Sequence, residues 1–211
     1  MTVLDVSTGK LVGVIPGVGA HNDSFSADHR AIALADPNSG LTVWKIGQTI
    51  KKQVAVEPPD PWVCGDSVLS PNGKLVAAEG PKPAISEDQC FSVFVWEVAT
   101  GKLIWQARAD IGQPRFSPDS QRIATSCWAG LYVWNAKTGA ELTKIQARRR
   151  LETPRPWPKV YPDPPRKSGP PDDRFFGPIA FAPDGKTLAT AGRDGFIRLW
   201  NTDTGAELSG K

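Results

Sequence analysis

Four stretches of the chain repeat the same order of apolar and polar residues. They are FSADHRAIALADPNSGLTVW at 25–44, LSPNGKLVAAEG followed by FSVFVW within 69–96, FSPDSQRIATSCWAGLYVW at 116–134, and FAPDGKTLATAGRDGFIRLW at 181–200. Each opens with an apolar residue, passes through a short polar turn and continues into a mostly apolar run. A second apolar run then ends in a tryptophan. Short runs between turn residues predict β-strands rather than helices.

The polar segment in each stretch predicts a tight hairpin turn. The segments read Ala-Asp-His at 27–29, Pro-Asn-Gly at 71–73, Pro-Asp-Ser at 118–120 and Pro-Asp-Gly at 183–185. Proline presets φ, and glycine after Asn or Asp supplies a positive φ. The strands expected after these turns are apolar on both faces, which is typical of strands buried on both sides. They cover 31–35, 75–78, 122–126 and 187–191.

A second turn motif follows each of these stretches except the first, and one further copy lies before all of them. DVSTGKLV, EVATGKLI, NAKTGAEL and NTDTGAEL begin at residues 5, 97, 135 and 201, with Thr-Gly at the same place in each. The glycine relieves a left-handed backbone position, and a further strand follows. The repeating unit is therefore expected to be an antiparallel meander of four strands.

This unit resembles the repeat of the WD-repeat β-propeller family, in which about 40 to 45 residues form one four-stranded blade. The resemblance is clearest in FAPDGKTLATAGRDGFIRLWNTDTGAEL, where Asn201 stands in place of the usual Asp. It implies a structural hydrogen-bond network of Trp200, Thr190 and Asp194. The tryptophans that recur at the repeat pitch are expected to pack within or between blades. They are Trp44, Trp96, Trp134 and Trp200.

The expected fold class is all-β: a β-propeller of four-stranded antiparallel blades, about four full blades plus a half blade, in an incomplete ring. Residues 1–211 form one propeller segment in this interpretation. Its parts are a half blade at 1–17, blades at 22–57, 62–109, 111–147 and 177–211, and a proline-rich basic insertion loop at 148–176. A closed ring has roughly four to eight blades.

Three explanations of the incomplete ring compete. The sequence is an excerpt of a longer propeller, or two or more copies complete a ring, or four blades close alone with residues 10–16 pairing with the last third strand. The first is favoured. An open arc would leave apolar blade faces and strand edges uncovered at both ends, which predicts self-association through those ends.

The distances between successive repeat tryptophans are 52, 38 and 66 residues, so two repeats contain insertions. The surplus residues lie near 58–62, at 81–89 and at 148–176. The resemblance implies that connections between blades, and those from second to third strands, open on one face of the disc. That face is the usual partner surface of the family, although loops also tolerate insertion without having a function.

The segment 148–176 contains eight of the chain's 20 prolines and eight Lys or Arg against four Asp or Glu. Its net charge is therefore +4, whereas the rest of the chain has a net charge of −1. A solvated loop is the preferred interpretation. The alternative is an electrostatic binder of nucleic acid or another polyanion through charge and stacking. Its candidate contact residues are Arg148, Arg149, Arg150, Arg155, Trp157, Lys159, Tyr161, Arg166 and Lys167.

Three further residues are candidate contacts for a partner on the loop-rich face. Trp128 and Arg193 are expected in turns between second and third strands, and Trp62 in a connection between blades. A tryptophan at the tip of a turn can anchor a protein partner. The alternative for Trp62 and Trp128 is that each folds over a neighbouring blade.

The sequence contains little that indicates catalysis. His21 and His29 both lie in the first blade region, and neither a nucleophile elbow nor a phosphate loop occurs. The three cysteines form no CxxC pair, and no cofactor or metal is expected. No apolar run approaches a membrane span, and the first residues lack the pattern of a signal peptide. The expectation is a non-enzymatic, cytoplasmic scaffold for a protein or peptide partner.

Overall fold

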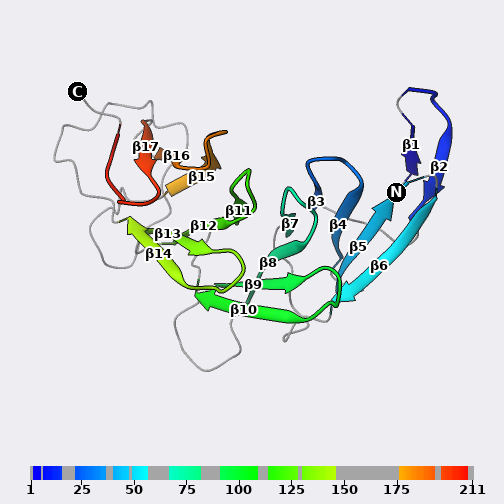
Figure 1. Ribbon diagram of the computed structural model, residues 1–211, viewed down its shortest axis with the longest axis horizontal. Helices are drawn as coiled ribbons and strands as arrows, with labels where there is room; N and C mark the ends of the chain where they lie inside the picture. The colour runs from blue at the N-terminus through cyan, green and yellow to red at the C-terminus, as the bar shows by residue number, and fades with distance from the viewer. Residues whose placement is uncertain are drawn as a thin grey trace, which may run out of the picture.

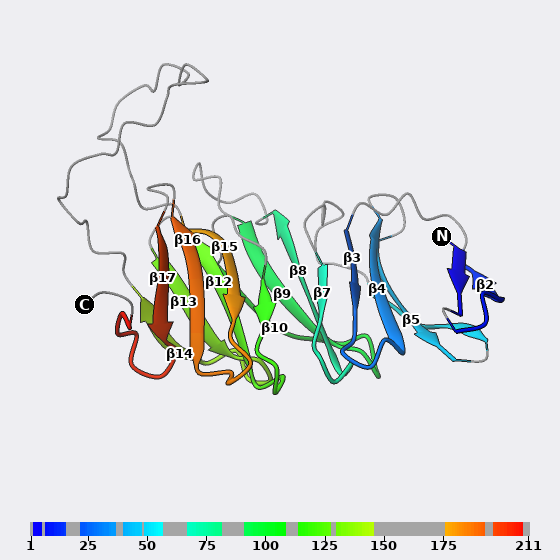
Figure 2. The ribbon, with the colours of Figure 1, turned by 90° about the horizontal axis from the view of Figure 1, so that it is seen from above.

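The computed structural model describes residues 2–5, 7–15, 22–36, 40–47, 49–56, 67–81, 91–108, 114–127, 130–145, 176–192 and 196–208. Within these ranges all regular structure is β-strand. The strands form five antiparallel sheets that follow one another along an open arc (Figure 1). Seen from above, the sheets stand side by side along the length of the molecule (Figure 2).

Each sheet is a meander in which the order of the strands follows the chain. The first sheet pairs β1 (Thr2–Leu4) with β2 (Leu11–Val14). The second contains β3 (Asn22–Phe25), β4 (Ala31–Asp36), β5 (Gly40–Ile46) and β6 (Ile50–Val56). The third contains β7 (Ser67–Leu69), β8 (Leu75–Pro81), β9 (Phe91–Glu97) and β10 (Leu103–Arg108).

The fourth sheet repeats the four-stranded pattern. It contains β11 (Arg115–Phe116), β12 (Arg122–Cys127), β13 (Gly130–Asn135) and β14 (Glu141–Ile145). The fifth contains β15 (Phe176–Phe181), β16 (Thr187–Gly192) and β17 (Ile197–Asn201), and a bridge from Trp200 to Glu207 begins a fourth row. The predicted fold class, all-β with four-stranded antiparallel blades, is thereby confirmed.

The arc does not close on itself. β2 pairs with β1 at one end of the arc, while β17 pairs with β16 at the other end (Figure 1). The suggestion that four blades close alone, with residues 10–16 joined to the last third strand, is therefore wrong. Three four-stranded sheets, one three-stranded sheet and one two-stranded sheet pack in a row and turn the chain through only part of a ring.

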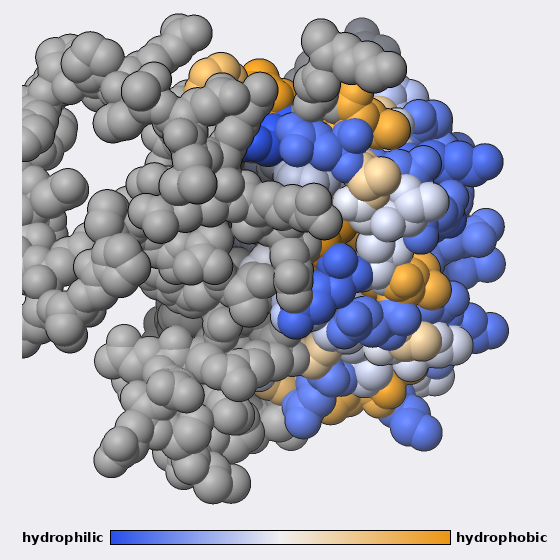
Figure 3. Space-filling model, turned by 90° about the vertical axis from the view of Figure 1, so that its left-hand side faces the viewer, coloured by the Kyte–Doolittle hydropathy of each residue, from blue (hydrophilic) through white to orange (hydrophobic). Residues whose placement is uncertain are grey.

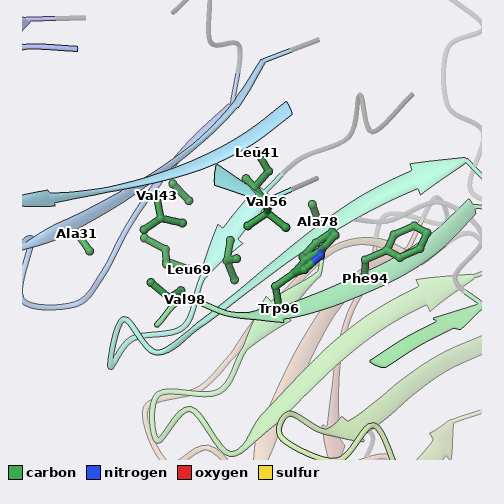
Figure 4. Packing of buried hydrophobic residues seen from close by; sticks show 11 residues of the cluster. Ala31, Leu41, Val43, Val56, Leu69, Ala78, Phe94, Trp96 and Val98 are labelled. Carbon is green, nitrogen blue, oxygen red and sulfur yellow. The ribbon is translucent and has the colours of Figure 1, made fainter. Parts of the chain in front are cut away.

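The core consists of joints between neighbouring sheets. Val76 and Ala78 of β8 pack toward the β3–β6 sheet, whereas Ala77 between them packs toward the β11–β14 sheet. Side chains of a strand alternate between the two faces, so a strand between two sheets must be apolar on both. Figure 4 shows the first of these joints, where Leu41, Val43 and Val56 gather with Leu69 and Trp96 of the next sheet.

The turn after the first strand of each full sheet has a repeated polar lock. In the fourth sheet, Ser117 Oγ donates to Asp119 Oδ1 at 2.5 Å and accepts from the backbone N–H of Arg122 at 2.9 Å. Ser26 with Asp28, and Ser70 with Asn72, make the same bonds. The lock satisfies backbone groups at the hairpin and fixes the register of the second strand.

Candidate interaction surfaces

The joint between two sheets has a fixed composition on the side of the earlier sheet. It uses an alanine of the second strand and two aliphatic residues that lie three and one positions before the tryptophan of the third strand. These residues are fully buried in the first three full sheets. They are Ala33, Leu41 and Val43, then Ala77, Val93 and Val95, then Ala124, Leu131 and Val133.

On the side of the later sheet, the Thr-Gly turn meets the outer strand of the earlier sheet. A β-carbon placed on Gly139 would lie 2.6 Å from Trp105 Cγ, and one on Gly101 would lie 2.7 Å from Val54 Cγ2. On Gly205 it would lie 3.1 Å from Thr143 Cγ2. Glycine is therefore required at this turn for two reasons. Its φ is near +70°, and the outer strand of the preceding sheet leaves no room for a side chain.

Polar bonds also cross these joints. Trp105 Nε1 donates to the carbonyl of Ala136 at 2.9 Å, and Thr143 Oγ1 donates to the carbonyl of Thr202 at 2.6 Å. Arg122 donates to Thr202 Oγ1 and forms an ion pair with Asp203 at 2.6 Å. Trp105 was not singled out from the sequence, because the same place in β2 and β14 holds Gly13 and Thr143 and so shows no repeat.

The residue after the repeat tryptophan caps the Thr-Gly turn. Asn135 Oδ1 accepts from the N–H groups of Lys137 and Thr138, and Asn201 Oδ1 accepts from those of Asp203 and Thr204, at 2.9 to 3.0 Å. Asp5 Oδ1 accepts in the same way in the first sheet. An Asn amide oxygen thus takes the capping role that the carboxylate takes at Asp5.

The repeat tryptophans lie in the joints. Trp96 and Trp200 are buried, and Trp44 and Trp134 are half-buried against neighbouring core residues. Trp200 Nε1 donates to Thr190 Oγ1 at 2.9 Å, and Trp134 makes the same bond to Thr125. Trp44 instead donates to Thr42 at 3.1 Å. Asp194, the third member of the network that the resemblance implies, lies outside the described residues.

Among the described residues, apolar side chains are exposed at both ends of the arc. At the first sheet, Leu4 is 55% exposed and Leu11 61% exposed. At the last sheet, Ile197 is 70% exposed and Leu199 38% exposed. Figure 3 views the molecule from the end that carries the last sheet, and apolar residues lie at the described surface among hydrophilic ones.

The predicted contact residues of the loop-rich face fall outside the described residues. These are Trp62, Trp128, Arg193, Arg155, Trp157, Lys159, Tyr161, Arg166 and Lys167. The strand ends that flank them are described. Because the strands of each meander alternate in direction, Val56, Cys127, Ile145 and Gly192 end their strands at the same edge of the arc. We call this the loop edge, and call the opposite one, where the hairpin and Thr-Gly turns lie, the turn edge.

Carboxylates of the turn edge have lowered pKa values. The Ser26 and Ser117 hydroxyls, which donate to Asp28 and Asp119, are the main cause of the lower pKa of each carboxyl. The pKa of Asp184 is lowered chiefly by the backbone N–H of Thr187. These aspartates therefore stabilise the hairpin turns through hydrogen bonds that their carboxylates accept.

The described part of the chain contains no group of three or more His, Cys, Asp or Glu placed to hold a metal ion. It also contains no helix long and apolar enough to cross a membrane.

Comparisons with known proteins agree with this geometry. Residues 179–201, which span most of β15 to β17, match the family described as WD domain, G-beta repeat. The predicted resemblance to WD repeats is thereby confirmed for the last sheet. Among solved structures, the computationally designed Ika8 protein is similar over 99% of this chain, with a TM-score of 0.65 and 18% identity. The chain spans 54% of the length of Ika8, and the likeness shows the fold alone.

Proposed function

We propose that the chain is a non-enzymatic scaffold that presents its loop edge to a protein or peptide partner. The observation that supports this most directly is the WD-repeat match at 179–201, because WD repeats generally mediate protein interactions. Fold alone does not define a role. The second support is that every connection with surplus length leaves from the loop edge.

The packing of the flanking strands favours such a role. Connections of the loop edge leave from β6, β12 and β14, and these strands pack in the joints between sheets. Trp128 would act as the anchor of the interface and Arg193 would supply charge-assisted hydrogen bonds. We place the chain in the cytoplasm as part of this proposal.

Site-specific photo-crosslinking in the native cell tests the proposal. A photoreactive phenylalanine analogue at position 128 should give a covalent adduct with another protein. The same analogue at position 137, an exposed residue of the turn edge, serves as the matched control. Equal adducts from both positions, or none from position 128, would contradict the proposed use of the loop edge.

The basic segment 148–176 supports a second candidate function, binding of a polyanion, because the positive net charge of the chain resides there. Fluorescence anisotropy with a labelled single-stranded DNA oligonucleotide tests it. If the segment binds phosphates, affinity should fall steeply with salt and vanish when 148–176 is deleted. Crosslinking from position 128 should survive that deletion, so the two candidates can be separated.

A further inference from the structure

The exposed face of the last sheet is built like the buried faces of the others. Ile197 and Leu199 lie three and one positions before Trp200, as Leu131 and Val133 do before Trp134. Ala189 pairs with Leu199 as Ala124 pairs with Val133. In the fourth sheet these positions are completely covered by the fifth. The exposed face of the β15–β17 sheet therefore has the composition of the earlier half of a joint, without a later sheet packed on it.

The exposed face of the first sheet is the other half of such a joint. Leu4 and Trp96 occupy equivalent positions, because each immediately precedes a Thr-Gly octet. Trp96 is only 1% exposed. Leu11 lies two residues after Gly9. Leu103, at the equivalent place after Gly101, packs against the preceding sheet. A β-carbon on Gly9 would have no atom within 4 Å, although φ is +68° as in the other Thr-Gly turns. This turn therefore lacks the outer strand on which the other turns rest.

The opposite face of the first sheet is already packed against the second sheet. Val3 and Ile15 pack with Ile32 and Leu34 of the second sheet, so only the side with Leu4 and Leu11 is free. One end of the chain thus offers the later half of a joint and the other end offers the earlier half. A surface that complements a different surface of the same molecule produces head-to-tail association.

We propose that a second copy of this chain docks its β1–β2 sheet on the free face of the β15–β17 sheet, continuing the arc across the boundary between copies. Ile197 and Leu199 of one copy would contact Leu4 and Leu11 of the next. The Gly9 turn of the next copy would lie beside the fourth row of the last sheet, which begins at Glu207. Burial of these aliphatic side chains away from water would stabilise the association of the two copies.

Two identical joints would close a pair of copies into a ring. If the curvature of the arc does not match, the same joint would join further copies into an open chain.

Mass measurement of the full chain in solution tests the proposal first. The chain has a mass of 22.8 kDa, and light scattering after size exclusion should give at least twice that value. Leu4→Asp and Ile197→Asp should each disrupt assembly, because each places a carboxylate in an apolar joint. Leu142→Asp is the control, since Leu142 is 47% exposed on β14 and lies at neither end of the arc.

Mixing the two variants gives the decisive result. Leu4→Asp keeps a native last sheet and Ile197→Asp keeps a native first sheet, so together they can form one native joint. We expect each variant alone to be a monomer and the mixture to form a 1:1 dimer, whatever the size of the unmodified assembly. Near-ultraviolet circular dichroism of the tryptophans shows that each variant is folded.

Two results would overturn the proposal. A monomeric unmodified chain would show that a second copy does not cover these faces, and that further blades of a longer polypeptide or another protein must do so. Persistent dimers of Leu4→Asp alone would show that two last sheets meet face to face instead. Neither result affects the proposed binding at the loop edge, which the crosslinking from position 128 tests separately.

Discussion

At the scale of single residues, the hairpin turns show where the sequence accepts backbone strain. His29, Gly73, Ser120 and Gly185 occupy the same turn position, and all have φ between 56° and 68°. Glycine adopts this region freely, whereas other residues pay a steric cost. Ser120 uses its side chain there, because its hydroxyl accepts from the N–H of Asn72 across the joint at 3.1 Å. His29 is exposed and makes a tilted ring contact with Phe25.

His29→Gly should stabilise the chain. The left-handed conformation costs a non-glycine residue about 1 to 2 kcal/mol, and glycine loses about 0.5 to 1 kcal/mol more backbone entropy on folding, so a net gain of about 0.5 kcal/mol is expected. Urea unfolding followed by tryptophan fluorescence measures it. Gly73→Ala is the converse control and should destabilise the chain by about 1 kcal/mol. A loss of stability in His29→Gly would mean that the ring contact outweighs the strain.

Asp119 makes stability depend on pH. Its pKa is lowered from the ordinary value of 3.8, mainly by the hydrogen bond from Ser117. The stabilisation is therefore fully present well above the unfolded value of 3.8 and is lost as the pH falls through the lower folded pKa. Asp119→Asn should keep the fold, because Asn72 forms the same lock in the third sheet, and should flatten the decline. Melting temperatures from pH 7 to pH 2 measure the difference, and parallel curves for both chains would contradict it.

At the scale of elements, the joints between sheets rather than the sheets themselves decide stability. A single four-stranded meander exposes two apolar faces, and it becomes stable only when a neighbour covers them. The Thr-Gly turn serves two purposes here. It reverses the chain between third and fourth strands, and its glycine approaches the outer strand of the preceding sheet.

Two glycine substitutions separate these purposes. Gly9 and Gly139 have φ of +68° and +72°, but only Gly139 lies against Trp105. Gly9→Ala should cost about 1 kcal/mol from backbone strain alone. Gly139→Ala should cost a further 1 to 3 kcal/mol or so, because a methyl group must displace the indole. Denaturant unfolding of the two variants measures both costs, and equal costs would show that the joint yields without loss. Comparison in the Ile197→Asp background removes any effect of Gly9 on association.

At the scale of the whole molecule, the arc is a one-dimensional array. The contacts between sheets run between neighbours along the chain, as in other repeat proteins. The central sheets are covered on both sides, and the first sheet has two strands and one covered side. Stability should therefore vary along the arc.

Hydrogen exchange should reveal this gradient. In the Leu4→Asp chain, amides of β8, β9, β12 and β13 should exchange slowest, and those of β1 and β2 fastest, because local opening is easiest where fewest apolar contacts are lost. Mass spectrometry of peptides after exchange gives the order. Uniform protection across all sheets would contradict an array and indicate one cooperative unit.

The sequence by itself determined the repeat, its strands and its turns. Apolar runs on both faces, hairpin-turn segments and Thr-Gly octets are local patterns that recur along the chain. Each is typical of one kind of strand or turn, so the four-stranded sheets could be predicted from them. The burial of the repeat tryptophans follows from the same pattern.

Only the tertiary structure decided how the sheets meet. The Trp105 indole beside Gly139, its bond to the carbonyl of Ala136, and the bond from Trp44 to Thr42 depend on residue types that do not recur at the same place in the other repeats. A repeat pattern carries no signal for such unique contacts. Closure is also a tertiary property, because the angle between packed sheets, and not the sequence of any one sheet, fixes how far the five sheets can bend the chain.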